Sequence, residues 1–250
     1  MNASSFPQTK EEMLSLRRSC AIARNVLQAV AKKAAPGVAL SELDALARRM
    51  LSEAEAVSAF EGYEHFPGVL CCSVNSLAVH GVPSAQKLQE GDIVGFDFGA
   101  VVNGWYSDTA VTVPVGRIAP EVGKLLDVAK EALRLGIAQA KAGNRVGDIS
   151  YAIQQYVEKE GFQIIRDLAG HGVGRTLHES PQVPNFGELG SGPKLVEGMV
   201  LAIEPILSRS SQKVRRSADG FGYETDDGSL AAHFEHTVFV TRGEPEILTG

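Results

Sequence analysis

Residues 92–114 have the sequence DIVGFDFGAVVNGWYSDTAVTVP. Asn103-Gly104 is the dipeptide most typical of a two-residue hairpin turn. The runs on either side of it are rich in β-branched and aromatic residues, which favour strands. We therefore predict an antiparallel hairpin whose strands cover 93–98 and 105–113.

Two aspartates share one face of this hairpin. In the register that the turn imposes, Asp97 and Asp108 are diagonal neighbours with Cα atoms roughly 7 Å apart. The strands around them are apolar and contain neither Lys nor Arg. A buried carboxylate without a cationic partner costs roughly several kcal/mol, so a metal ion is the simplest partner for the pair. The alternative is a solvated face on which both aspartates are ordinary surface charges.

The rest of the chain predicts the same order of elements twice. Apolar residues at spacings of three and four predict helices that begin at Thr9, Ser41, Pro120 and Asp148. Besides the hairpin, strands are predicted near 69–74, 162–165, 199–206 and 234–240. Two helices followed by strands, twice, indicate an α+β fold with an internal duplication. We expect one domain, 1–250, whose halves, about 9–115 and 119–250, share one sheet and one core.

Matching segments support the duplication. Glu90-Gly91, before the first strand of the hairpin, recurs 107 residues later as Glu197-Gly198. In each copy a carboxylate stands seven residues after the glutamate, Asp97 in the first half and Glu204 in the second. The duplication therefore adds a second-half carboxylate at the position equivalent to Asp97.

Three residues of the second half extend the aspartate pair to a candidate metal site. Glu204 and Glu235 lie in apolar predicted strands, and His171 lies in a glycine-rich segment where the backbone can approach a site closely. One histidine and four carboxylates form an oxygen-rich set, which suits Mn, Fe(II) or Co better than a thiolate-type zinc site does. Two such ions about 3.5–4 Å apart can hold a bridging hydroxide and polarise a substrate carbonyl.

The other histidines differ in their surroundings. His80 and His178 stand in glycine- or turn-containing segments close to the candidate ligands, and both are candidates for a functional role. His65 and His233 are predicted to be surface or loop residues. His236 follows Glu235 on a strand, so it is predicted to face the opposite side and to be structural.

Composition excludes several classes of protein. The chain of 250 residues has a net charge of −6 and no basic stripe, which argues against nucleic-acid binding. The longest stretch without charged residues, 66–86, contains several polar residues, and the first 12 residues lack the apolar core of a signal peptide. The three cysteines, Cys20, Cys71 and Cys72, do not form a disulfide pattern. We expect no membrane span and a cytoplasmic location.

Seven segments carry a family resemblance. They are VHGVP (79–83), DIVGFD (92–97), SDT (107–109), GHGVG (170–174), HESP (178–181), IEP (203–205) and FEHT (234–237). In this order they resemble the type I methionine aminopeptidases, which are pita-bread-fold metallopeptidases, and the resemblance covers the chain from about residue 9 to the end. It implies two pseudo-symmetric halves that share a curved antiparallel sheet, with helices on the outer face.

The resemblance also implies roles for the candidate site residues. The positions that match the family's five ligands for two divalent ions (Co, Mn, Fe(II) or Zn) are Asp97, Asp108, His171, Glu204 and Glu235. Among these, Asp108 and Glu235 match the ligands that bridge both ions, and Glu204 matches the residue that moves a proton from the metal-bound water.

Further positions match parts of the substrate site. His80 matches the histidine near the scissile nitrogen, and His178 matches the one that contacts the substrate carbonyl. The residues at positions of the methionine pocket are Tyr63, Phe66, Cys71 and Phe221, together with Phe60 and Leu177.

The implied activity is removal of the initiator methionine from nascent polypeptides, with a preference for a small second residue. A metal-bridging hydroxide would attack the scissile carbonyl. A monomer and a transient contact with the ribosome are also expected.

Two alternatives remain. One is a proline-specific aminopeptidase of the same fold, although such relatives carry a large extra N-terminal domain and here about eight residues precede the first predicted helix. The other is a non-catalytic binding module of the pita-bread fold, although such modules have lost ligands that are all present in this chain.

Overall fold

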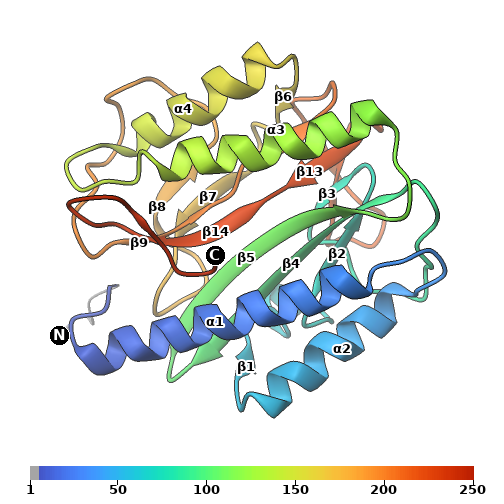
Figure 1. Ribbon diagram of the computed structural model, residues 1–250, viewed down its shortest axis with the longest axis horizontal. Helices are drawn as coiled ribbons and strands as arrows, with labels where there is room; N and C mark the ends of the chain where they lie inside the picture. Colours follow the sequence, from blue (N-terminus) through green and yellow to red (C-terminus); the bar gives the residue numbers. More distant parts are fainter. Residues whose placement is uncertain (1–5) are drawn as a thin grey trace.

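Four α-helices cover one face of a nine-stranded sheet in the computed structural model, which describes residues 6–250 (Figure 1). The helices form two pairs, α1 (Lys10–Lys33) with α2 (Leu40–Glu53) and α3 (Pro120–Ile137) with α4 (Val146–Lys159). The strands of the large sheet follow the order β1 (Val57–Ser58), β4 (Ile93–Val102), β5 (Trp105–Pro114), β14 (Glu235–Phe239), β9 (Val200–Ile203), β7 (Ala169–Gly172) and β8 (Glu179–Pro184). Two further strands pair with this row, β2 (Cys71–Val74) with β4 and β15 (Glu246–Ile247) with β14.

Two three-stranded sheets flank the large one. The first consists of β13 (Ala231–His233), β10 (Ile206–Ser208) and β6 (Gln163–Ile164), and the second of β11 (Val214–Arg216), β12 (Tyr223–Thr225) and β3 (Leu77–Val79). A short 3-10 helix covers Tyr63–His65. The α+β class and the repeated order of helix pair and strands are therefore confirmed. None of the described helices is both long enough and apolar enough to cross a membrane.

The helix starts show how local sequence sets the boundaries. The Thr9 hydroxyl accepts a hydrogen bond from the backbone N–H of Glu12, which is the predicted capping box of α1. The helices α2 and α4 begin one and two residues earlier than predicted. In both, an acidic side chain in the first turn reaches back to the preceding backbone N–H: Glu42 to that of Ala39 and Asp148 to that of Arg145.

The predicted hairpin is confirmed as β4 and β5. Val102 pairs with Trp105 across the Asn103-Gly104 turn, and the register places Asp97 opposite Ala110 and Asp108 opposite Gly99. The first strand runs to Val102 rather than to Phe98, because it stays paired as far as the turn.

One strand predicted as continuous is divided in the structure. The run 199–206 becomes β9 and β10, which belong to different sheets. The break falls at Glu204-Pro205, where proline has no backbone N–H to continue the ladder. The strand predicted near 234–240 is confirmed as β14, and a further short strand that was not predicted, β13, ends at His233 just before it. The break between β9 and β10 lies beside the break between β13 and β14, because the backbone N–H of Phe234 donates to the carbonyl oxygen of Pro205.

The two halves of the chain meet along the ladder between β5 and β14. Glu235 pairs with Ala110, and His236 pairs with Thr109. Since this ladder joins a strand of the first half to one of the second, the large sheet is continuous across the molecule. We propose that 9–115 and 119–250 are duplicated halves of one domain, and this shared sheet supports the proposal.

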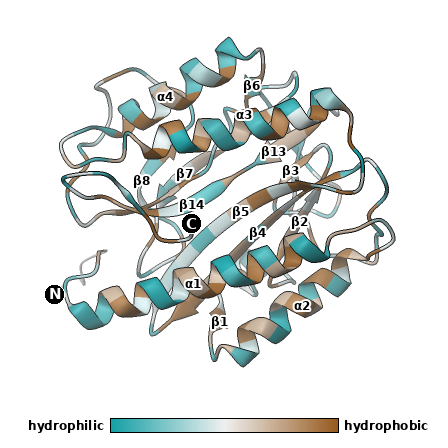
Figure 2. Ribbon diagram, viewed as in Figure 1, coloured by the Kyte–Doolittle hydropathy of each residue, from teal (hydrophilic) through white to brown (hydrophobic). Residues whose placement is uncertain are grey.

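Apolar side chains fill the space between the sheet and the helices. Beneath α1 and α2 they include Leu43, Phe96 and Phe98, all fully buried, and beneath α3 and α4 they include Ile149 and Ile153. Burying such a side chain contributes about 1.5–3 kcal/mol. Figure 2 shows hydrophobic residues along β4 and β5 beneath the helices. The helix face of the sheet is thus occupied by core, and the opposite face is left for a site.

Candidate metal centre

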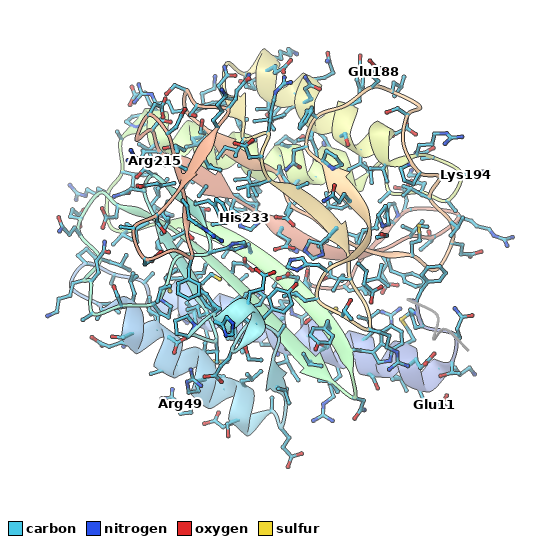
Figure 3. All side chains as sticks on the ribbon, turned by 180° about the vertical axis from the view of Figure 1, so that it is seen from behind. Glu11, Arg49, Glu188, Lys194, Arg215 and His233 are labelled. Carbon is cyan, nitrogen blue, oxygen red and sulfur yellow. The ribbon has the colours of Figure 1, made fainter. Side chains whose placement is uncertain are left out.

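The candidate site residues lie on the face of the sheet that points away from the helices. Along β4, Phe96 and Phe98 pack beneath α1 and α2, so Asp97 between them faces the other way. All thirteen residues predicted for the site line one cavity of about 370 Å³ on this face. They are Phe60, Tyr63, Phe66, Cys71, His80, Asp97, Asp108, His171, Leu177, His178, Glu204, Phe221 and Glu235. Figure 3, seen from behind, looks onto this face.

Threonines hold the carboxylate-bearing strands together. The backbone N–H of Asp108 donates to Thr237 Oγ1 (3.0 Å), which in turn donates to the carbonyl oxygen of Asp108 (2.7 Å). Thr109 Oγ1 donates to the carbonyl oxygen of Glu235 (2.9 Å). These buried bonds fix the backbones of Asp108 and Glu235 on adjacent strands, so that both side chains project into the cavity.

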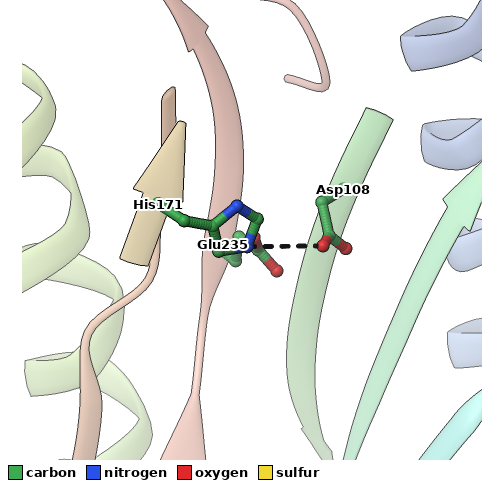
Figure 4. A group of neighbouring side chains, drawn as sticks. All are labelled: Asp108, His171 and Glu235. Carbon is green, nitrogen blue, oxygen red and sulfur yellow. Dashed lines mark ion pairs between the residues drawn. The ribbon is translucent and has the colours of Figure 1, made fainter. Parts of the chain in front are cut away.

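Four side chains converge in the centre of the cavity. Ligand atoms of Asp108, His171 and Glu235 all lie within 4.8 Å of one another (Figure 4). His171 Nε2 is 3.7 Å from Asp108 Oδ2 and 3.5 Å from Glu204 Oε1. Each of these residues is nearly fully buried. The structure therefore brings together residues from β5, β7 and β14 with Glu204, which follows β9.

The ring of His171 is oriented to offer a lone pair to the cluster. Its Nδ1 lies 2.9 Å from the carbonyl oxygen of Gly172, which can only accept a hydrogen bond. The hydrogen of the neutral ring therefore sits on Nδ1, and the Nε2 lone pair faces the carboxylates. This arrangement, with the second ring nitrogen bonded to a carbonyl, is typical of metal-ligating histidines.

Glycines on both sides of His171 permit close approach of neighbouring backbones. A Cβ atom on Gly170 would lie 2.4 Å from the carbonyl oxygen of Ala202, and one on Gly172 would lie 2.5 Å from that of Ser180. Real Cβ atoms essentially never approach this closely. The glycines therefore allow His171 to sit between β8 and β9.

The electrostatics of the cluster favour a bound cation. Burial raises the pKa of Glu204 and Glu235 well above the usual range and that of Asp108 to about 7. Asp97 Oδ1, Asp108 Oδ1 and Glu235 Oε1 are buried and have no hydrogen-bond partner among the described residues. Oxygen-rich acidic ligands with one imidazole suit a divalent ion. The residues present therefore fit a metal ion.

The metal-free protein should lose stability as the pH rises from 6.5 to 8. The folded cluster holds protons that the unfolded carboxyls, with pKa values of about 4, have already released, so deprotonation in this window favours unfolding. Below pH 6.5 the lowered pKa values of buried His171 and His233 act in the opposite direction. We expect the Tm of chelator-treated protein to fall across the window and a saturating divalent ion to remove the fall. A flat or rising Tm without metal would contradict the raised carboxyl pKa values.

His80 and His178 both line the cavity, at its more exposed side. His178 lies beside the cluster, with its ring centroid 4.4 Å from that of His171, and its Nδ1 is 2.8 Å from Tyr63 Oη. His80 has a φ of +58°, in the left-handed region that residues other than glycine rarely adopt. Backbone strain of this kind is concentrated at functional sites.

An apolar pocket adjoins the acidic cluster. Phe60, Phe66, Cys71 and Leu177 are buried and belong to one hydrophobic cluster, against which Phe221 packs. The rings of Phe66 and Phe221 meet edge to face with centroids 5.9 Å apart. Tyr63 is more exposed, at 40%, and lies at the boundary between this pocket and His178.

The remaining histidines test the sequence-based expectations. His65 is exposed, as predicted, and His236 faces away from the cavity, where its Nδ1 lies 3.0 Å from Thr249 Oγ1. The prediction for His233 is wrong: it is 4% exposed, lines the cavity, and places Nε2 3.5 Å from Glu204 Oε2. No local signal in the sequence predicts this position, because His233 and Glu235 lie on different strands, β13 and β14, of different sheets.

Comparisons with known proteins agree with this arrangement. The chain is 44% identical over 239 residues to a methionine aminopeptidase of Clostridium acetobutylicum, covering 95% of this chain and 96% of that one. It is 43% identical to methionine aminopeptidase 1 of Bacillus subtilis, with coverages of 97% and 98%. The structure of methionine aminopeptidase from Thermotoga maritima matches with a TM-score of 0.95 and 42% identity, covering 97% of this chain and 98% of that chain. A prolidase from Pyrococcus furiosus shares the fold, with a TM-score of 0.78 at 23% identity, covering 98% of this chain and 66% of that one.

The pita-bread fold and its buried carboxylate–histidine cluster define a metallopeptidase. Residues 15–242 match the sequence profile of metallopeptidase family M24. The chain belongs to metallopeptidase family M24.

Proposed function

We propose that this chain is a methionine aminopeptidase, which removes the N-terminal methionine from polypeptides whose second residue is small. The observation that carries the proposal is the match of 43–44% identity, over nearly the full length of both chains, to proteins of that name. The cavity supports it, because it combines an acidic cluster with an adjoining apolar pocket.

We propose that Asp97, Asp108, His171, Glu204 and Glu235 hold two divalent cations, with Asp108 and Glu235 shared between them. The buried, unpartnered carboxylate oxygens and the Nε2 lone pair of His171 support this ligand set. Mn, Fe(II), Co and Zn are the candidate ions. Bound cations would supply the Lewis acidity that polarises the scissile carbonyl and activates water.

Glu204 is proposed as the residue that moves the proton to the leaving amine. Burial raises the pKa of its carboxyl, so the group can hold a proton near neutral pH. Its side chain reaches the cluster from the break between β9 and β10, where it contacts the ring of His171. The raised pKa and the position beside His171 support both proposed roles of Glu204, cation binding and proton transfer.

His178 and His80 are proposed to contact the peptide bond that is cleaved. When Tyr63 Oη donates to His178 Nδ1, the ring hydrogen of His178 lies on Nε2, where it can donate to the substrate carbonyl oxygen. His80 would lie near the scissile nitrogen. Both rings are on the open side of the cavity, from which a peptide would enter.

We propose that the methionine side chain occupies the apolar pocket. Phe66, Cys71 and Phe221 line it with buried or half-buried surface, and Phe60 and Leu177 close it. Methionine is unbranched and has a polarizable thioether, which packs well against aromatic rings. Tyr63 would lie at the junction of the pocket and the scissile bond.

The two alternative functions are not favoured. The chain covers 66% of the prolidase to which it is structurally similar, and the identity of 23% supports a common fold alone. A non-catalytic module of the fold would have lost members of the cluster, whereas the cavity of this chain contains all five.

The substrates, in this proposal, are newly made polypeptides in the cytoplasm. The three cysteines are free and buried, which suits a reducing compartment. The enzyme would act as a monomer. It would contact the ribosome transiently.

A peptide panel tests the proposed activity. Met-Ala-Ser, Met-Leu-Ser and Ala-Pro-Ala are incubated with the protein in Mn²⁺ or Co²⁺, and the released amino acid is measured. We expect methionine release from Met-Ala-Ser, with far less from Met-Leu-Ser and no cleavage of Ala-Pro-Ala. Cleavage of Ala-Pro-Ala instead would indicate a proline-specific enzyme. Failure to cleave any peptide with metal bound would indicate a binding module.

A further inference from the structure

His233 occupies an unusual position beside the acidic cluster. It is 4% exposed, and its Nε2 is buried with no hydrogen-bond partner among the described residues. The same atom lies 3.5 Å from Glu204 Oε2 and 3.8 Å from Glu235 Oε2. His233 lies near the middle of the view in Figure 3, and it lines the cavity. The resemblance assigns no role to this residue.

The backbone of His233 is fixed on both sides. Its N–H donates to Thr112 Oγ1 (2.9 Å), and Thr112 Oγ1 donates to its carbonyl oxygen (2.9 Å). Across the small sheet it pairs with Ile206, two residues after Glu204. The ring is therefore held at a set distance from the Glu204 carboxylate.

Glu204 lies between two imidazole rings that present opposite chemistry to it. His171 faces Oε1 with the lone pair of Nε2, because its hydrogen is on Nδ1. His233 faces Oε2, and when Glu204 is ionised, as it would be as a metal ligand, this oxygen can only accept a hydrogen bond. A lone pair on His233 Nε2 would be repelled by the lone pairs of Oε2. The favourable tautomer of His233 therefore carries its hydrogen on Nε2.

We propose that His233 is a positioning residue for Glu204: its Nε2–H donates to Oε2 and holds the carboxylate with Oε1 turned towards His171. The distance of 3.5 Å is just beyond the usual range of about 2.7–3.2 Å for an N–H···O hydrogen bond, and a small rotation of the carboxylate would bring it within that range. This inference rests on the proposed aminopeptidase function.

Three substitutions separate this role from a merely structural one. The amide nitrogen of glutamine can reach the place of imidazole Nε2, whereas that of asparagine cannot, and leucine has no donor. In the Co²⁺-loaded protein, we expect His233→Leu and His233→Asn to lower kcat for Met-Ala-Ser by about 10–100-fold with little change in KM. We expect His233→Gln to stay within about threefold of the wild type.

Two measurements do not depend on turnover. We expect each variant to bind as many Co²⁺ ions per chain as the wild type. The visible absorption of bound Co²⁺ should change in the Leu and Asn variants and be restored in the Gln variant. The Tm of each metal-free variant reports folding, and if His233→Leu does not fold, the Asn and Gln variants carry the comparison.

Two results would overturn the inference. Wild-type kcat and Co²⁺ absorption in the Asn and Leu variants would show that Glu204 needs no donor from His233. The loss of one bound Co²⁺ in these variants would make His233 a metal ligand instead. If the wild type itself releases no methionine, the proposed function fails, and the Co²⁺ count and absorption still decide the role of His233.

Discussion

Replacing Asp108 by asparagine should abolish methionine release, with a fall of about 10³-fold or more in kcat/KM. Asp108 projects from β5 into the centre of the cluster, within 3.7 Å of His171 Nε2, and is proposed to be shared by both cations. Losing a shared ligand removes several kcal/mol of transition-state charge stabilisation, and each tenfold corresponds to about 1.4 kcal/mol. Asparagine has nearly the same shape, so the fold should persist.

The stability of the same variant provides an independent check. Burial raises the pKa of Asp108, which means that its ionised form is unfavourable in the metal-free protein. Asp108→Asn should therefore keep or raise the metal-free Tm at pH 8 while reducing the Tm gain from Mn²⁺. The matched control is Asp127→Asn, at an exposed residue of α3. This substitution should change neither the metal-free Tm nor the Tm gain from Mn²⁺. Near-normal turnover by Asp108→Asn would rule out the proposed ligand role.

Replacing Glu204 by glutamine should lower kcat by about 10²–10⁴-fold and leave KM nearly unchanged. A general acid–base group contributes a factor of this size, and glutamine keeps the length and one oxygen of the side chain but cannot carry the proton. Glu204 is not one of the apolar residues that form the methionine pocket, so binding of the methionine side chain should be retained. Steady-state kinetics with Met-Ala-Ser measure both constants.

The control for this variant is Glu188→Gln, an amide substitution at a residue outside the cavity. It should have wild-type kcat and KM. If Glu204→Gln retains full kcat, another group moves the proton. A rise in KM with unchanged kcat would instead assign Glu204 to substrate binding.

The hairpin of β4 and β5 shows how much of this fold is predictable from sequence. The Asn103-Gly104 turn determines the register, and the register determines that Asp97 and Asp108 share a face. This reasoning succeeds because turn chemistry and strand alternation are local. The repeat of Glu90 and Asp97 as Glu197 and Glu204 is equally local, since it depends only on spacing.

His233 shows where such reasoning stops. Its place in the cavity depends on the break between β13 and β14 and on the pairing of β13 with β10 in a second sheet. Neither follows from spacing, because both are set by contacts between distant segments. The apolar pocket is similar, since Phe66, Leu177 and Phe221 come from three separate segments, and the residues themselves carry no pattern that brings them together.

The most direct test of the metal centre is methionine release by metal-stripped protein as Mn²⁺ is added back. The protein is treated with chelator, and bound Mn²⁺ and released methionine from Met-Ala-Ser are measured at each addition. We predict no release without metal and activity that rises with bound Mn²⁺ up to two ions per chain. Undiminished release by protein shown to be free of metal would contradict the account, and so would full occupancy without any release.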